Sequence, residues 1–278
     1  MVRILALHGV GSSGALLKSQ LAPLMLQLGT KYQFVFMDGA IERPRGPGMP
    51  AASSGPFYSY TTGYSPREIT EALEDIDIFI EDFGPFDGIL GFSQGASMAM
   101  AYILQHQKAH GVGSSPFQFA ILFSSVAVFS PDPYDFKDVI GGIHARGSPL
   151  ENTSEDAFRK YLHLTFDVAK KIGAVSTDYN TDFWQSESID MVPRIMHPGI
   201  YLDRIDLPTV HVMGRRDLPS MLEQSNLSHK LCQPLSTKLY THQGGHGLPL
   251  STVDVKAVGN LIEWAEEEGL RHHHLSSL

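Results

Sequence analysis

Ser93, Asp217 and His246 have side chains suited to nucleophilic catalysis and lie in glycine-containing motifs, and Ser93 has the most specific motif. Ser93 lies in Gly91-Phe92-Ser93-Gln94-Gly95, which matches the pattern G-x-S-x-G. The match is meaningful because it falls between an apolar run typical of a buried strand and a segment with helical spacing. On such a sharp turn the serine hydroxyl is exposed above the sheet, and the two glycines relieve crowding with the neighbouring backbone. We therefore predict Ser93 to be a nucleophile.

A serine hydroxyl is a poor nucleophile without a base, and His246 is the candidate base. It stands in Gln243-Gly244-Gly245-His246-Gly247, just after the last predicted strand. Asp217, in Gly214-Arg215-Arg216-Asp217, follows the strand before that and is the candidate acid. The order serine, aspartate, histidine is the one expected for an α/β-hydrolase. All three residues follow the carboxyl ends of strands, the edge at which open α/β sheets bind ligands.

Other histidines and aspartates compete for these roles. His242 lies four residues before His246 and suggests a metal pair. The glycines between them argue against the helix that such a pair needs, and we predict no metal site. Asp203, Asp206 and Asp254 are alternative acids, although Asp206 precedes its strand and would lie at the wrong edge of the sheet.

The turn after the first predicted strand, Gly9-Val10-Gly11-Ser12-Ser13-Gly14, has two interpretations. In a hydrolase this turn supplies a backbone N–H to the oxyanion, so Val10 and Gln94 are the predicted donors. In an NAD(P)-dependent oxidoreductase, Gly9, Gly11 and Gly14 would form the phosphate fingerprint and Asp38 would bind the ribose. The serine, aspartate and histidine set favours the hydrolase, because a dinucleotide-binding domain does not predict it.

Strand-like and helix-like segments alternate along the chain. This alternation predicts an α/β fold with a mostly parallel central sheet flanked by helices, as in the α/β-hydrolase architecture. The expected strands are 2–8, 32–37, 87–92, 118–123, 208–213 and 237–240, and the expected helices are 13–28, 65–82, 94–110, 155–172 and 252–268.

Two segments interrupt this alternation. Residues 39–65 are rich in proline, glycine and serine and predict a long irregular loop. Residues 126–206 contain few strand-like runs and predict a cap inserted into a single domain that spans 1–278. Both segments are candidates for the walls of a pocket for an apolar or aromatic acyl group. The candidate wall residues are Phe57, Tyr58, Phe129, Phe183 and Trp184.

Composition excludes several other classes of protein. The 278 residues contain 21 Lys and Arg against 30 Asp and Glu, a net charge of −9, so we expect no nucleic-acid partner. The longest apolar stretch, 120–129, is about half of what a membrane helix needs. A single cysteine, Cys232, excludes an intramolecular disulfide and leaves the redox compartment open. The first apolar run is too short for a secretory signal, so the expected location is the cytoplasm.

With these motifs in place, the chain resembles the fungal serine hydrolase family of α/β-hydrolases. That family includes polyketide-pathway releasing thioesterases and the ovarian-cancer-associated hydrolase. The resemblance covers nearly the whole chain. It rests on Ile4-Leu5-Ala6-Leu7-His8-Gly9, Gly55-Pro56-Phe57-Tyr58, Phe86-Asp87-Gly88-Ile89-Leu90-Gly91-Phe92-Ser93-Gln94-Gly95, Gly214-Arg215-Arg216-Asp217 and Gly244-Gly245-His246.

The resemblance implies Ser93 as nucleophile, Asp217 as the orienting acid and His246 as base. The chain departs from the family at one point, since family members often carry a bulky aromatic residue after the His-Gly pair, where this chain has Val10.

We predict a serine hydrolase without a cofactor that cleaves an acyl thioester or ester through an acyl-enzyme. The resemblance implies release or editing of a polyketide-type acyl group, held on an acyl carrier domain, in fungal secondary metabolism. A net charge of −9 would not attract an acidic carrier, so docking would need a local patch. The alternatives are a small-molecule carboxylesterase or deacetylase without a carrier partner, the oxidoreductase, and a non-catalytic binding member of the fold.

Overall fold

The central element of the molecule is a six-stranded sheet in which every pair of neighbouring strands is parallel. The computed structural model describes residues 1–49, 52–184 and 189–276. The spatial order of the strands is β10-β9-β6-β5-β1-β2. All six predicted strands are present, and their ends differ from the predicted ones by at most two residues. They are β1 Val2–Leu7, β2 Tyr32–Met37, β5 Gly88–Phe92, β6 Phe119–Phe123, β9 Thr209–Gly214 and β10 Thr237–His242.

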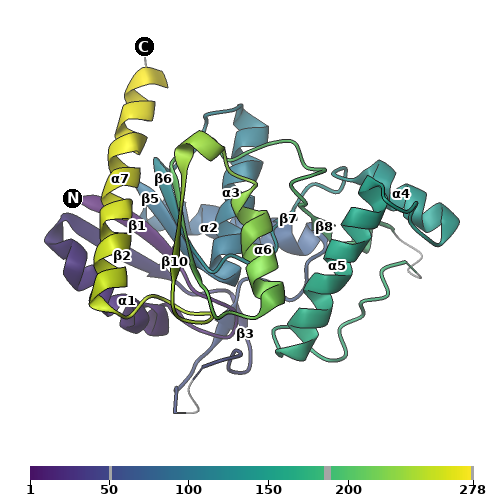
Figure 1. Ribbon diagram of the computed structural model, residues 1–278, viewed down its shortest axis with the longest axis horizontal. Coiled ribbons are helices and arrows are strands. Elements are labelled where there is room, and N and C mark those ends of the chain that lie inside the picture. Colours follow the sequence, from purple (N-terminus) through teal and green to yellow (C-terminus); the bar gives the residue numbers. More distant parts are fainter. Residues whose placement is uncertain (50–51, 185–188, 277–278) are drawn as a thin grey trace.

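Helices cover both faces of this sheet, so the predicted α/β fold is confirmed. Ile4 and Ala6 of β1 pack in one core with α1 (Gly14–Leu28) and α7 (Thr252–Ser276). Leu5 and Leu7 point to the opposite face and join the core that contains α2 (Pro66–Phe83) and α3 (Gln94–His110). Alternate residues of a strand point to opposite faces, so a strand buried on both faces reads as a continuous apolar run. In Figure 1, α7 stands on one side of the sheet and α6 (Pro219–His229) on the other.

Local capping signals set where the helices begin. Ser65 caps α2 by accepting a hydrogen bond from the Glu68 N–H, while the Glu68 carboxylate accepts the Ser65 N–H in return. Pro66 occupies the first turn, where a missing N–H costs nothing. Ser13 caps α1 by accepting the Leu16 N–H, here without a reciprocal side-chain bond. Both starts agree with the sequence prediction.

The predicted irregular loop 39–65 contains two short antiparallel strands, β3 (Ile41–Glu42) and β4 (Tyr58–Ser59). The loop is bonded to the turn after β1. The Tyr58 N–H donates to the Ser12 carbonyl at 2.7 Å, and the Gly11 N–H donates to the Tyr58 carbonyl at 2.8 Å. The loop therefore supports the turn from which an oxyanion donor is predicted.

The segment 126–206 lies beside the sheet, at the opposite end of the view from α7 (Figure 1). Its aromatic residues, among them Phe129, Phe158 and Phe166, belong to the same hydrophobic core as α2 and α3. The side chain of Arg194 is almost fully buried and donates to the carbonyls of Pro133 and Val192. The elements of the segment 126–206 are β7 Phe129–Ser130, α4 Lys137–Arg146, α5 Ser154–Lys171, a 3-10 turn Ile189–Met191 and β8 Arg194–Ile195. Elsewhere in the chain, 3-10 turns are formed by Gly29–Lys31 and Pro234–Ser236.

The helix α5 was predicted from the sequence, whereas α4 and, outside this segment, α6 were not. Within 1–49, 52–184 and 189–276, no helix combines the length and the apolar character that crossing a bilayer requires.

Candidate active site

Ser93 occupies a sharp turn between β5 and α3. Its backbone has φ 53° and ψ −113°, a conformation that a residue other than glycine rarely adopts. The turn is held by the Ser93 N–H, which donates to the Phe123 carbonyl of β6 at 2.9 Å. A Cβ on Gly91 would lie 2.4 Å from the Ala96 Cα, so only glycine fits there. The glycines of the motif are therefore steric requirements of a tight strand-to-helix connection.

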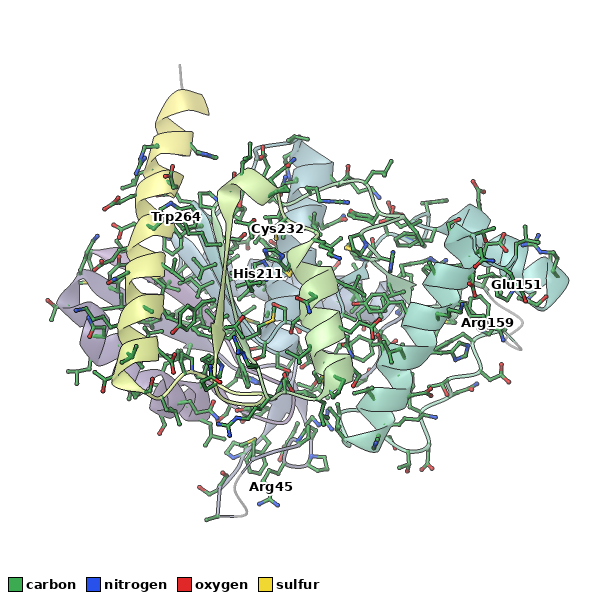
Figure 2. The ribbon with its side chains drawn as sticks, viewed as in Figure 1. Arg45, Glu151, Arg159, His211, Cys232 and Trp264 are labelled. Carbon is green, nitrogen blue, oxygen red and sulfur yellow. The ribbon has the colours of Figure 1, made fainter. Side chains whose placement is uncertain are left out.

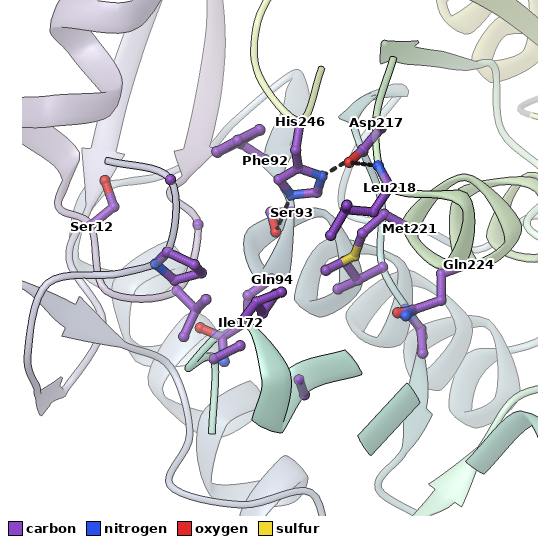
Figure 3. Close-up of a pocket in the computed structure, with 18 of the residues that line it drawn as sticks. Ser12, Phe92, Ser93, Gln94, Ile172, Asp217, Leu218, Met221, Gln224 and His246 are labelled. Carbon is purple, nitrogen blue, oxygen red and sulfur yellow. Dashed lines mark hydrogen bonds and ion pairs between the residues drawn. The ribbon is translucent and has the colours of Figure 1, made fainter. Parts of the chain in front are cut away.

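The structure brings Ser93, His246 and Asp217 into one hydrogen-bonded chain (Figure 3). His246 Nδ1 lies 2.7 Å from Asp217 Oδ2, and His246 Nε2 lies 2.9 Å from Ser93 Oγ. A carboxylate can only accept, so Nδ1 carries the proton and Nε2 is left to accept from the serine hydroxyl. The Asp217 side chain is 2% exposed and that of His246 28% exposed. The other carboxylate oxygen of Asp217 accepts the Leu218 N–H at 2.7 Å, which fixes the carboxylate plane.

The loops that carry Asp217 and His246 are bonded to each other. The Arg215 N–H donates to the His242 carbonyl and the Arg216 N–H donates to the Gly244 carbonyl, both at 2.8 Å. These loops follow the neighbouring parallel strands β9 and β10, so they leave the sheet at the same edge. Asp217 and His246, which are 29 positions apart in the sequence, are thus brought into direct contact.

His242 shapes the loop that carries His246. Its Nδ1 accepts the Gly244 N–H at 3.1 Å, so Nε2 carries the proton and donates to the Gly247 carbonyl, also at 3.1 Å. Both ring nitrogens of His242 therefore have backbone partners within this loop. In the part of the chain that the structure describes, no three His, Cys, Asp or Glu side chains are grouped to hold a metal ion.

The competing aspartates lie in other surroundings. Asp254 accepts hydrogen bonds from the hydroxyls of Tyr240 and Ser251. Asp203 and Asp206 precede β9, at the opposite edge of the sheet from Ser93. Asp217 is therefore the aspartate that the structure brings to His246.

The predicted oxyanion donors, Val10 and Gln94, both line the cavity above Ser93. His8 Nε2 accepts the Gly39 N–H at 3.1 Å, so its Nδ1 is the protonated nitrogen and donates to the Gly9 carbonyl at 2.7 Å. The Gly9 carbonyl and the Val10 N–H belong to one peptide unit, and in a trans peptide they point in opposite directions. The N–H of Val10 is therefore directed away from His8.

His8 was not singled out from the sequence, because its ring nitrogens bond backbone atoms, the Gly9 carbonyl and the Gly39 N–H. The imidazole is fully buried, and this burial lowers its pKa, so the ring stays neutral. The Tyr60 hydroxyl accepts the His8 N–H at 2.8 Å and donates to the Met37 carbonyl at 3.2 Å. A buried network of neutral groups thus holds the turn, and the only sequence signal for it is the His-Gly pair itself.

The same turn leaves no place for a dinucleotide phosphate. The Asp38 carboxylate accepts the Gly14 N–H at 2.6 Å at the start of α1, the position that a pyrophosphate would take. A Cβ on Gly11 would lie 2.3 Å from the Gly46 nitrogen, because the loop 39–65 crosses the turn there. The alternative built on Gly9, Gly11, Gly14 and Asp38 is therefore not supported.

A cavity of about 380 Å³ opens above Ser93 (Figure 3). Of the five predicted wall residues, the structure places Phe129 on this cavity. Phe183 stands behind the wall, with its ring 4.9 Å from that of Phe166. Trp184 donates from its indole nitrogen to His163.

Phe57 and Tyr58 also lie off the cavity wall, although the Tyr58 backbone supports the oxyanion turn. The lining residues that were not predicted come mainly from α5, α6 and the loop after β6: Val126, Ala127, Thr165, Phe166, Ala169, Ile172, Leu218, Met221 and Gln224.

A parallel sheet with a serine on the turn after a central strand, and a histidine and an aspartate on the turns after the last two strands, defines a serine hydrolase of the α/β-hydrolase fold. The chain belongs to the FSH1 serine hydrolase family, whose description, Serine hydrolase (FSH1), matches residues 1–258. This confirms the predicted family and makes the chain an enzyme of the serine hydrolase and esterase type.

Two fungal relatives are similar over nearly their whole length. "Esterase alnB" of Emericella nidulans is 35% identical over 98% of this chain and 99% of that protein. "Hydrolase FUB4" of Fusarium oxysporum is 31% identical over 94% of this chain and 97% of that protein. Among solved structures, the meta-cleavage product hydrolase of Pseudomonas fluorescens shares the fold, with a TM-score of 0.50 and 14% identity over 95% of this chain and 92% of that one.

Proposed function

We propose that Ser93, His246 and Asp217 form a catalytic triad that hydrolyses an acyl ester or thioester through an acyl-enzyme. The observation that carries the proposal is the hydrogen-bonded chain from Asp217 through His246 to Ser93 beneath an open cavity. His246 Nε2 takes the proton of the Ser93 hydroxyl as Oγ attacks the substrate carbonyl. Asp217 holds the tautomer that leaves Nε2 free and stabilises the imidazolium once it forms.

The backbone N–H groups of Val10 and Gln94 are the proposed donors to the oxyanion. Gln94 is the first residue of α3, where backbone N–H groups have no partner within the helix. Two fixed donors lower the barrier by roughly 3 kcal/mol each. His246 then returns its proton to the leaving oxygen or sulfur, and a water molecule attacks the acyl-enzyme to release a carboxylic acid.

The substrate is proposed to be an apolar or aromatic acyl group on a small molecule or on an acyl carrier domain. The walls of the cavity near Phe129, Phe166 and Met221 are apolar, which suits such a group. A polyketide-type acyl chain released or edited in fungal secondary metabolism is the form that the family resemblance suggests. Arg216 on this cavity and Lys171 on the adjoining one are cations that could face an acidic carrier.

A carboxylesterase or deacetylase without a carrier partner is the second candidate, and the name of the esterase relative favours it. One acyl group presented as a pantetheine thioester and as a matched oxoester separates the two candidates. Faster thioester hydrolysis supports the carrier-linked role, whereas faster oxoester hydrolysis supports the esterase.

Ser93→Ala tests the triad itself and is expected to lower kcat by about a millionfold. Ser97→Ala is the matched control, because Ser97 lies one turn further along α3 and its hydroxyl donates to the Ala127 carbonyl at 2.6 Å. Wild-type turnover by Ser93→Ala would rule the mechanism out.

A further inference from the structure

Two buried polar side chains interrupt the apolar wall of the cavity, and the proposed mechanism uses neither. Thr165 of α5 is 7% exposed and Gln224 of α6 is 2% exposed, and both line the cavity. The Thr165 hydroxyl has no hydrogen-bond partner among the residues that the structure describes. A buried hydroxyl without a partner is costly, and most such groups in proteins are satisfied.

Gln224 offers a donor at the same wall. Its Oε1 accepts the Ala127 N–H at 3.0 Å, and because an N–H can only donate, the oxygen end of the amide is identified. The other end of the amide, Nε2, takes no part in that bond and can donate to a molecule in the cavity. Gln224 lies on the side of the cavity opposite Ser12 (Figure 3). Gln224 therefore brings N–H donors to this part of the cavity wall.

We propose that Thr165 and Gln224 form a subsite for a keto or hydroxyl oxygen carried by the acyl group, an inference that rests on the proposed function. An acceptor oxygen on the substrate would give both side chains a hydrogen-bond partner. The apolar residues Phe129, Phe166 and Met221, which line the same cavity, fit the carbon chain that carries this oxygen. The acyl part of the substrate takes this end of the cavity, because its residues are nearly fully buried. The leaving group must reach solvent and takes the opposite end.

Gln224 also has a structural role that the test must separate from recognition. The Ser225 hydroxyl donates to the Ser125 carbonyl, and the Ser228 hydroxyl donates to the Val126 carbonyl. Together with Gln224, these side chains of α6 hold the segment after β6 in place by three hydrogen bonds. Ser225→Ala removes one of these hydrogen bonds at a residue that does not line the cavity, so it is the matched control.

The experiment measures kcat/KM for p-nitrophenyl esters of an unsubstituted octanoyl chain and of octanoyl chains with one keto oxygen at successive positions. The wild-type enzyme is expected to prefer one keto chain over the unsubstituted chain by about tenfold. Thr165→Val and Gln224→Met are each expected to lower that ratio several-fold, and Ser225→Ala is expected to leave it unchanged. A preference for the unsubstituted chain at every position, or a ratio that survives in both variants, overturns the subsite.

The binding of free acids to the Ser93→Ala variant tests the subsite independently of catalysis. Calorimetry with the keto acid and with octanoic acid is expected to show tighter binding of the keto acid, by a margin that Thr165→Val reduces. Equal affinities overturn the subsite even if the esters are hydrolysed. Tighter binding of the keto acid together with wild-type turnover by Ser93→Ala would support the subsite while rejecting the proposed triad.

Discussion

A methyl group at position 95 tests whether the close packing of α3 against β1 sets the catalytic geometry. A Cβ built on Gly95 lies 2.3 Å from the Leu7 carbonyl oxygen and 2.7 Å from that of His8. Ordinary contact begins at 3.4 Å, so α3 and the end of β1 must separate by about 1 Å to admit Gly95→Ala. The end of β1 leads into Val10, and α3 follows Ser93. The separation therefore moves the proposed oxyanion donor away from the nucleophile.

The size of the effect follows from what blocks the methyl group. The blocking atoms belong to the backbone, so no side-chain rotation relieves the contact. A misplacement of about 1 Å in a catalytic site costs on the order of 100-fold in rate, and we expect a loss of that size in kcat/KM. Overpacking of this kind is also expected to lower the free energy of unfolding by about 1–3 kcal/mol.

Gly141→Ala in α4 is the control, because a Cβ there meets no atom within 4 Å. Alanine in a helix interior is expected to raise the free energy of unfolding by roughly 0.5–1 kcal/mol and to leave kcat/KM unchanged. Hydrolysis of a p-nitrophenyl ester and urea unfolding at the same temperature separate lost geometry from lost folding. A folded Gly95→Ala protein with wild-type kcat/KM would refute the reasoning.

Three further outcomes are expected. Asp217→Asn should lower kcat by about 10⁴-fold at unchanged far-UV circular dichroism, because the amide neither fixes the His246 tautomer nor stabilises the imidazolium; a loss below tenfold in steady-state kinetics would contradict this. Burial, with a smaller effect from His229, lowers the pKa of His211 to about 3. Below pH of about 6.5, His211 is protonated in the unfolded chain but not in the folded protein. The free energy of unfolding should therefore decrease as the pH is lowered, by at most about 1.4 kcal/mol per pH unit. Urea unfolding between pH 7 and 5 should show a shallower slope in His211→Gln, and an unchanged slope would reject this cause. Arg194→Met should lower the free energy of unfolding by about 3 kcal/mol, because the carbonyls bonded by the guanidinium lose their donor; unchanged urea unfolding would show that those bonds contribute little.

His211 and Cys232 form a second pair of potentially reactive side chains, away from Ser93, that is buried in the core. Figure 2 places them close together, and His211 Nε2 lies 3.3 Å from Cys232 Sγ. A cysteine beside a histidine resembles a nucleophile with its base, but burial raises the pKa of the Cys232 thiol to about 12. The thiol and the imidazole are therefore both neutral, and the pair is part of the core.

The inner strands β1, β5, β6 and β9 could be predicted because burial on both faces leaves a continuous apolar run in the sequence. The order of the strands in space could not, since β1 lies between β5 and β2 and no local pattern specifies those neighbours. The helix α4 was missed because Gly141 and Gly142 at its centre weaken the helical pattern. Its formation depends on packing, with Ile140 and Ile143 fully buried.

The proximity of Ser93, Asp217 and His246 could be inferred because a parallel sheet brings every residue that follows a strand to one edge. The walls of the cavity could not be inferred in the same way. Phe129, Phe166 and Phe183 are all buried aromatic residues, yet two of them line the cavity and Phe183 packs behind. Residue type predicts burial, but the side of the wall on which a ring lies depends on how the segment 126–206 packs.

The supporting contacts around the catalytic loops that the sequence does not reveal share one property, which is that they are made with backbone atoms of other residues. His8 bonds the Gly9 carbonyl, His242 bonds the Gly244 N–H and the Gly247 carbonyl, and the Tyr58 backbone bonds that of Gly11. A backbone partner leaves no complementary side chain in the sequence, so no spacing reveals the contact. The glycines of these loops permit a sharp turn but do not hold it, and a reacting carbonyl needs donors that are held. The rigidity required by the proposed chemistry therefore comes from buried, hydrogen-bonded groups around the loops. A methyl group at Gly95 would push the end of β1 and its turn away from α3 against these bonds, so it is expected to lower the rate.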